Sequence, residues 1–254
     1  MYLFPLLHRN FKESLDLEPI GEPMSITRLQ SKQVASGSGS ASATASGDAY
    51  ASNTTPSSLL VLVARSDASW SSGGSTAPNI STPTTSGFTW EQAVTVFYTD
   101  ATNQKSSTVT IFYIANAGAM SSSLSTSVTA TKSGAVSTDV SFTAYEFTGV
   151  KTASSLDQIN GAFSQTSSPI TAGSLVTTGT ALIIAACIAE ATVSTGSGFT
   201  AGPNTSEQYI LNHSSGTIST AFGNNSGSQE WGACAADFLA SGSVTLSNAF
   251  TFGF

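Results

Sequence analysis

The chain has 254 residues, of which 40% are hydrophobic and only 9% are charged, and its formal net charge is -7. Because no basic stripe is present to neutralise phosphates, we do not expect it to bind nucleic acid. The length suits one large all-β domain with an appendage.

Residues 1–33 are predicted to form an N-terminal arm. Large apolar side chains are scattered through it with neither a 3.6 nor a 2 period, and they are interspersed with charges and three prolines. We expect the arm to become ordered against a partner, because a free tail would leave these side chains in water. The residues predicted to bind the partner are Tyr2, Leu3, Phe4, Leu7, Phe11, Leu15, Leu17 and Ile20.

The same N-terminal stretch does not resemble a secretory signal. Residues 1–7 are too short for a signal-peptide core and lack a preceding basic region. The longest apolar segments, residues 59–64 and 181–189, have the length of strands, so no membrane span is expected. We therefore predict a soluble protein without a signal peptide.

Residues 34–56 are predicted to be a linker. Residues 35–47 contain only Gly, Ser, Ala and Thr, a composition typical of flexible spacers. The β-sandwich domain is predicted to cover residues 57–254.

Apolar and β-branched runs, separated by turn signals, predict the strands of that domain. They cover residues 58–65, 93–99, 108–115, 125–131, 140–148, 181–189, 208–211, 217–222 and 231–238.

The second half of the domain repeats the outline of the first. We match residues 59–64 with 181–189, 94–97 with 208–211, 108–114 with 217–222, and 142–147 with 231–238. Each half supplies about four or five strands, too few to bury its own face. The predicted fold is therefore an all-β, antiparallel two-sheet jelly-roll-like sandwich built from two related halves.

Residues 244–254 place Phe250, Phe252 and Phe254 on one face of a predicted strand. We expect this strand to close the sheet or to dock on a neighbouring copy. Cys187 and Cys234 both fall in predicted strands, where buried free thiols are favoured over a disulfide.

No motif predicts catalysis, a cofactor or a metal site. His8 and His213 lack metal-ligand spacing, and no nucleophile elbow occurs. Four acidic residues near strand ends could in principle serve a glycosidase, but they are isolated in the sequence. These are Glu146, Glu190, Glu230 and Asp237. Glu146 and Asp237 occupy corresponding points of the two halves, so we interpret them as structural hydrogen-bonding groups.

Six aromatic residues could form a sugar-binding platform. They are Trp70, Trp90, Trp231, Tyr98, Tyr113 and Tyr209. Aromatic residues in strands usually pack in a core. Trp70, predicted to lie in a loop, is the best candidate for contact with a glycan.

The order of these elements along the chain is similar to that in a group of known proteins. An apolar strand, a Gly-Phe-Thr loop, a Tyr-bearing strand and residues 145–150 are followed by residues 181–186 and 196–202. This order resembles a loose group of β-sandwich modules of bacterial surface proteins and phage virion proteins, over about residues 57–240. With its arm and without a signal, the chain looks like a capsid decoration, or cement, protein of a tailed phage.

The resemblance implies a non-enzymatic protein that is made in the host cytoplasm and lies on the capsid surface. It would stabilise the capsid through its arm and through self-association, so its expected partners are the major capsid protein and copies of itself. A glycan bound at Trp70 would then belong to the host surface. A tail or head fibre that binds a receptor is an alternative. Two further alternatives are a carbohydrate-binding module or adhesin, and a hydrolase, which would need two carboxylates close together in a cleft.

Overall fold

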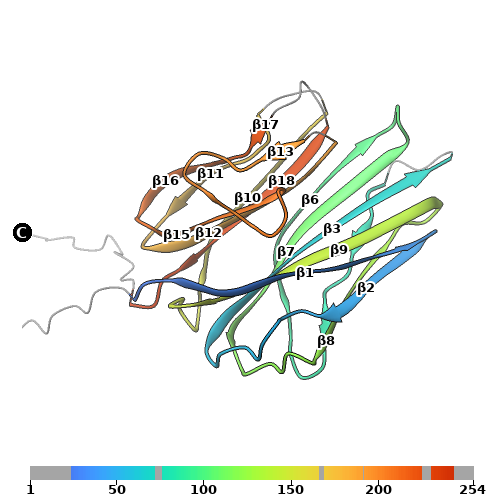
Figure 1. Cartoon of the computed structure of the whole chain (residues 1–254). Coiled ribbons are helices and arrows are strands. Elements are labelled where there is room, and N and C mark those ends of the chain that lie inside the picture. The colour runs from blue at the N-terminus through green and yellow to red at the C-terminus, as the bar shows by residue number, and fades with distance from the viewer. Residues whose placement is uncertain (1–23, 72–75, 166–168, 191, 225–229, 243–254) are drawn as a thin grey trace, which may run out of the picture.

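The computed structural model describes residues 24–71, 76–165, 169–190, 192–224 and 230–242. These residues form antiparallel strands and contain no helix, which confirms the predicted all-β sandwich (Figure 1). Among the described residues, no helix is therefore long and apolar enough to span a membrane.

The first half of the chain supplies nine strands to the described structure. Their bounds are β1 Thr27–Gly39, β2 Ser42–Asp48, β3 Ser58–Trp70, β4 Asn79–Ile80, β5 Thr84–Thr85, β6 Glu91–Asp100, β7 Lys105–Ala117, β8 Ser125–Thr131 and β9 Ala135–Thr148. The second half supplies another nine. These are β10 Leu156–Ser164, β11 Thr171–Thr177, β12 Ala181–Ala189, β13 Val193–Ser194, β14 Thr200–Ala201, β15 Glu207–His213, β16 Gly216–Ala221, β17 Gly223–Asn224 and β18 Trp231–Leu239.

Two five-stranded sheets pack face to face at the centre. Their strand orders are β1-β9-β3-β7-β6 and β10-β18-β12-β15-β14. The outer face of the first sheet is covered by β2, β8, β4 and β5, and that of the second by the pairs β11-β16 and β13-β17. Figure 1 shows β1–β9 gathered in one lobe and β10–β18 in the other.

The near-continuous apolar run of β3 is explained by its position between two cores. Leu59, Val61 and Val63 face the second central sheet, whereas the alternate residues face the outer sheet on the other side. Since successive side chains of a strand point to opposite faces, a strand covered on both sides has to be apolar throughout. β12 is apolar throughout for the same reason.

The internal repeat is present, but two of the predicted strand matches are wrong. In the first half β3 lies between β9 and β7, with β6 outside β7; in the second, β12 lies between β18 and β15, with β14 outside β15. Thus β7 corresponds to β15, whereas the sequence matched β15 with β6. Likewise, β8 corresponds to β16, because β8 pairs with β2 and β16 pairs with β11. The very short β14 had no sequence signal, which shifted the matches by one strand.

The predicted linker is wrong for most of its length. β1 pairs with β9, and β2 pairs with β8, so the low-complexity stretch forms two strands of the fold. Ala43 and Ala45 are buried while the Ser and Thr residues beside them are exposed. This alternation is the strand period, which composition alone concealed. The boundary predicted at residue 33 falls inside β1.

Cross-strand hydroxyl pairs hold β2 to β8. Thr44 pairs with Thr129 at 2.9 Å between their Oγ1 atoms, and Ser46 pairs with Ser127 at 2.6 Å between their Oγ atoms. Such pairs contribute about 0.2–1 kcal/mol each relative to alanine pairs. They take the place of ion pairs on this charge-poor surface.

The two ends of the described chain meet at one corner. Met24 N donates to Ser241 O at 3.0 Å, and Ser241 N donates to Gly149 O at 2.7 Å. Ile26 is buried in the central core, so the last part of the predicted arm belongs to the sandwich.

Cys187 and Cys234 are buried free thiols, as predicted. They lie on the neighbouring strands β12 and β18, but Cys187 faces the core under β11 and β16 while Cys234 faces the central core. Opposite faces of one sheet exclude a disulfide between them. Burial raises the pKa of the Cys187 thiol to about 12.

Gly37 should be required for the close packing of β1 against β2. A Cβ atom on this residue would lie 1.9 Å from Thr44 O. We expect Gly37→Ala to lower the free energy of unfolding by about 1–3 kcal/mol, because the backbones of the two strands would have to move apart. Ser38→Ala, at the exposed neighbouring position, should change it by less than about 0.5 kcal/mol. Urea unfolding measures both, and equal stability of the two variants would contradict the assignment.

Candidate functional site

A polar cleft opens between the two central sheets at the end of the strands opposite to the chain ends. β12 begins beside Leu239, next to the chain ends, and its last residue, Ala189, lines the cleft. The cleft has a volume of about 670 Å³. The residues that line it are Asp67, Ala68, Ser69, Tyr98, Lys105, Ser106, Ser107, Ser137, Asp139, Ala189 and Glu190.

Two aspartates face each other across the floor of this cleft. Asp67 of β3 and Asp139 of β9 are directly opposite in the strand register, and both are exposed. Ser107 donates a hydrogen bond of 2.5 Å to Asp67 Oδ1. Desolvation by the cleft walls raises the pKa of Asp67, and the nearby Asp139 charge adds to the rise, while Ser107 and Arg65 oppose it. Like charges in opposite positions destabilise a sheet, so this pair is a functional candidate.

More carboxylates gather at the rim of the cleft. Lys105 Nζ lies 3.2 Å from Glu190 Oε1 in a partly exposed ion pair. Burial, together with the charges of Asp100 and Glu190, raises the pKa of Glu230 to about 7. Glu230 therefore titrates near neutral pH, so the charge of this rim depends on pH.

A buried ion pair lies behind the cleft. Arg65 Nη2 of β3 is 2.7 Å from Glu207 Oε1 of β15, although its N–H is not aligned as a hydrogen bond. Thr143 donates to Oε1 at 2.9 Å, and the Tyr145 hydroxyl donates to Oε2. Burial raises the pKa of Glu207, an effect that the Arg65 charge and these two donors oppose. The pair joins the two halves of the protein.

The chemistry of the cleft is that of hydrogen bonding. Its carboxylates accept from hydroxyl or ammonium groups, and its serines both donate and accept. Among the described residues, no group of three or more His, Cys, Asp or Glu side chains could hold a metal ion. The cleft thus suits a hydroxyl-rich or cationic ligand.

The pair Asp67 and Asp139 was missed by sequence reasoning. The two residues are 72 positions apart, and only the register of β3 with β9 brings them together. Of the four carboxylates named from the sequence, Glu190 lines the cleft, and Glu230 lies close enough to have its pKa raised by Glu190. Their position near strand ends was the only available signal.

Glu146 and Asp237 form structural hydrogen bonds, as the sequence indicated. Glu146 accepts from Gln30 Nε2 at 2.6 Å and from Thr55 N at 2.5 Å, and Asp237 accepts from Gln158 N. Each stands opposite an irregularity in its edge strand, β1 or β10. Asp237 therefore receives a backbone donor of β10 that the disturbed ladder leaves without its strand partner, whereas Glu146 binds a side chain of β1 and the backbone N–H of Thr55.

The eight arm residues predicted to bind a partner, Tyr2 to Ile20, lie outside the described residues. His8 also lies outside them. His213 ends β15 rather than sitting in a turn, and its Nδ1 is buried without a hydrogen-bond partner.

Trp70 does not lie in a loop. It is the last residue of β3, its side chain is 6% exposed, and Lys132 Nζ lies 4.6 Å from the centre of its ring. A covered ring offers no face for stacking on a sugar. The other five aromatic residues considered for a glycan platform are also buried, as the core interpretation predicted.

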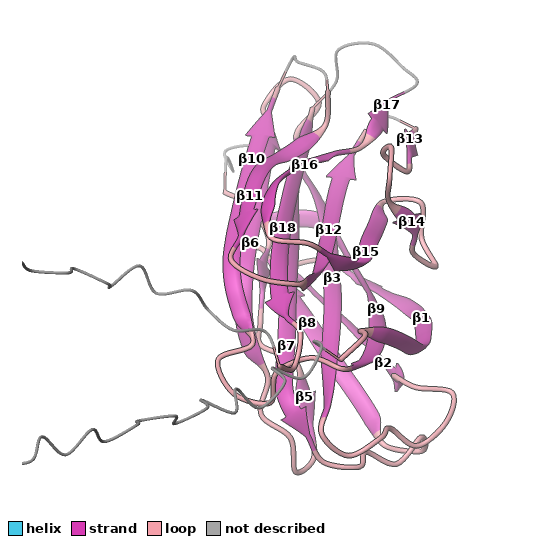
Figure 2. Ribbon diagram, turned by 90° about the vertical axis from the view of Figure 1, so that its left-hand side faces the viewer, coloured by secondary structure: helices cyan, strands magenta, loops and turns pink. Residues whose placement is uncertain are grey.

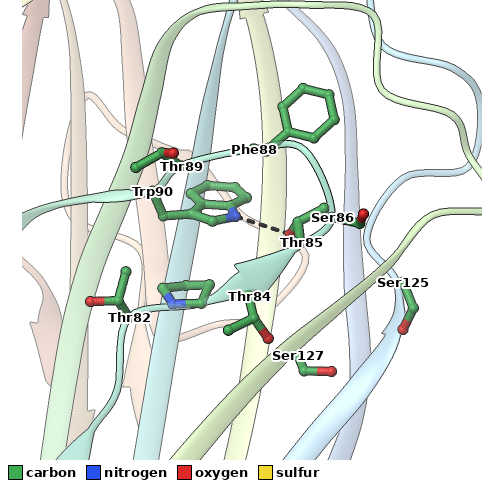
Figure 3. Close-up of a pocket in the computed structure, with 10 residues that line it drawn as sticks. Thr82, Thr84, Thr85, Ser86, Phe88, Thr89, Trp90, Ser125 and Ser127 are labelled. Atoms are coloured by element: carbon green, nitrogen blue, oxygen red, sulfur yellow. Dashed lines mark hydrogen bonds between the residues drawn. The ribbon is translucent and has the colours of Figure 1, made fainter.

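A second pocket, of about 470 Å³, lies beside Trp90 (Figure 3). The Trp90 indole N–H donates to Thr85 Oγ1 at 3.0 Å, and the remaining lining side chains are mainly Ser and Thr. No residue that lines this pocket carries a charge, whereas Asp67, Lys105, Asp139 and Glu190 line the polar cleft, which is therefore the better functional candidate.

Comparisons of the chain with protein-family models, with curated proteins and with solved structures found no match. The resemblance noted above therefore depends on its sequence motifs, and the structure supports the β-sandwich part of it.

Breaking the buried ion pair should strongly destabilise the fold. Arg65→Met leaves Glu207 charged and unpaired, so we expect the free energy of unfolding to fall by about 3–5 kcal/mol. The double variant Arg65→Met with Glu207→Met should be more stable than Arg65→Met alone, because no buried charge remains. Lys105→Met, which removes the exposed pair, should cost about 0–1 kcal/mol. Chemical unfolding tests all three, and a double variant less stable than Arg65→Met would contradict the account.

Asp237 should make the fold less stable as pH rises. It is fully buried, its Oδ2 has no hydrogen-bond partner, and burial raises its pKa to about 7. The pKa of an aspartate in the unfolded chain is about 3.9, so a higher pKa in the folded state stabilises the fold fully at pH values below about 3.9. This stabilisation is lost as the pH rises from there towards 7. Glu230 contributes with the same sign.

We expect the melting temperature of the wild-type protein to be higher at pH 5 than at pH 8. Asp237→Asn keeps an oxygen for Gln158 N and removes the buried charge, so it should raise the melting temperature at pH 8 and weaken the pH dependence. A wild-type melting temperature that rises with pH would contradict this assignment.

Proposed function

We propose that the chain is a non-enzymatic structural protein of a virion, a capsid decoration protein that binds the major capsid protein through its N-terminal arm and associates with copies of itself. The observation that carries the proposal is the meeting of the chain ends, where Met24 N bonds to Ser241 O. Residues 1–23 and 243–254, which both carry large apolar side chains, are joined to the described chain at this corner, so one contact region could receive both.

The character of the sandwich supports the same proposal. Hydroxyl pairs link neighbouring strands at Ser69 with Ser137 and at Thr95 with Thr110, and the described residues contain two ion pairs. Stability that depends little on surface charge is also little affected by salt. This property suits a protein on the outside of a particle.

The polar cleft lies at the far end of the sandwich from the chain ends. In a decoration protein attached through its termini, the cleft would face outward, where host glycans could reach it. This arrangement also fits the alternative of a head or tail fibre that binds a receptor. The number and position of copies in purified particles distinguish the two roles, because decoration requires hundreds spread over the capsid.

Deletion of residues 1–23 should abolish binding to capsids and leave the sandwich folded. The cut preserves β1, which begins at Thr27; a cut after residue 33 would remove half of that strand. In the full chain, Leu7→Ser with Phe11→Ser should weaken binding at least tenfold, whereas Asn10→Ala with Ser14→Ala should not. Cosedimentation with capsids that lack the protein measures binding, and normal binding by the deletion variant would refute the proposal.

A further inference from the structure

The two central sheets expose an edge at the same place. β6 is the last strand of the first central sheet and β10 the first of the second, and within the described chain no strand pairs with the outer side of β6. Gln165 Nε2, just after β10, donates to Thr99 O of β6 at 2.9 Å. Figure 2 shows β6 and β10 near one another at one side of the molecule. We refer to β6 and β10 here as the β6–β10 edge.

Large apolar side chains are exposed on this edge. Ile159 and Phe163 of β10 are 49% and 62% exposed, and Phe97 of β6 is 55% exposed. Ile159, Gly161 and Phe163 share the face of β10 that is turned towards β6, because a Cβ atom on Gly161 would lie 2.4 Å from Val96. A strand added beside β6 would cover Ile159 and Phe163 with one of its faces.

The backbone of β6 is oriented to accept such a strand. The Thr99 carbonyl points away from β7, since it accepts from Gln165. Backbone direction alternates along a strand, so the N–H and C=O groups of Thr95 and Phe97 also point outward. An exposed edge with outward backbone groups and apolar flanks is a template for strand addition.

Residues 243–254 have the sequence that this edge requires. Val244, Leu246, Phe250, Phe252 and Phe254 occupy alternate positions, a set that Asn248 interrupts once, and the residues on the other face are Ser, Thr, Ala or Gly. This alternation is that of a strand with one apolar face. Placed on β6, the apolar face would lie against Ile159 and Phe163, and the small polar face would remain in solvent.

The direction of pairing selects a second copy as the source of the strand. β6 and β10 run the same way, since Glu91 and Leu156 at their starts line one pocket and Thr99 contacts Gln165 near their ends. Leu239 N bonds to Ser155 O, so the chain after Gly242 starts beside the beginning of these strands and would run parallel to β6.

Every strand pair of the described residues is antiparallel. To pair antiparallel with its own β6, the segment would first have to reach the far end of that strand. The 10 residues of β6 span about 33 Å, and the 12 residues of the segment reach about 40 Å, so only about two would remain for pairing. A second copy approaches from either direction without this restriction.

We propose that residues 243–254 of one copy add an antiparallel strand to the β6–β10 edge of a second copy. This inference specifies the self-association in the proposed function, and its test needs no capsid. If the chain is monomeric, the proposed strand addition is wrong, but binding of the arm to capsids is unaffected. If the arm does not bind capsids, the proposed strand addition is unaffected.

Sedimentation velocity of the full chain over a range of concentrations tests the proposal. We expect the full chain to associate with itself. The association should be at least tenfold weaker in the triple variant Phe250→Ser, Phe252→Ser and Phe254→Ser. Thr245→Ala, Ser247→Ala and Thr251→Ala, on the other face of the segment, should leave it unchanged. On the receiving side, Ile159→Glu with Phe163→Glu should weaken it similarly, whereas Val136→Glu, at an exposed position of β9, should not. Monomers at all concentrations, or wild-type association of the Phe variant, would overturn the proposal.

Disulfide trapping identifies the contact directly. The native thiols of Cys187 and Cys234 are fully buried, so they do not interfere. A Phe163→Cys chain mixed with a Phe252→Cys chain carrying a larger tag should form a covalent heterodimer under mild oxidation. A double variant that forms only a bond within one chain would show that the segment folds back on its own edge, and would overturn the proposal.

Discussion

The burial of one ion pair constrains how the two halves of this protein meet. Arg65 comes from the first half and Glu207 from the second, and Glu207 is the carboxylate that lies within ion-pair distance of the buried Arg65 side chain. Such a pair adds little net stability over an apolar replacement, but a misaligned packing would leave a charge buried without a partner. We regard it as the contact that fixes the alignment of the central sheets.

The surroundings of this pair explain why the core and the cleft adjoin. On one side, Tyr145 stacks on Phe147 with ring centres 5.9 Å apart, and Tyr209 contacts both rings edge-on. On the other side the same sheet face continues as Asp67 and Asp139. The ion pair thus lies at the boundary between the apolar centre of the sandwich and its polar end, and partial desolvation there accounts for the raised pKa of Asp67.

The molecule is consequently polar at one end and joined to its apolar segments at the other. Between these ends, hydroxyl pairs link exposed positions of neighbouring strands, as at Thr44 with Thr129 and at Ser46 with Ser127. Both proposed roles, capsid decoration and receptor binding by a fibre, would use the two ends in the same way. The terminal segments would make the contacts that assemble copies, and the cleft at the other end would remain free. The β6–β10 edge, which begins beside the chain ends, belongs to the assembling end.

The sequence by itself determined nine of the eighteen strands of the described residues, the all-β sandwich and the burial of both cysteines, because these depend on local alternation and apolar runs. It indicated that the two halves are related, but it matched only two of the four strand pairs correctly. It also indicated the structural role of Glu146 and Asp237 through their equivalent positions. It misjudged residues 34–48, whose small side chains hide a strand pattern that becomes stable only when β8 and β9 supply partners. Tertiary structure alone decided the pairing of Asp67 with Asp139, the burial of Trp70 and the contact of Arg65 with Glu207, since each depends on strand register or sheet packing between residues far apart in the chain.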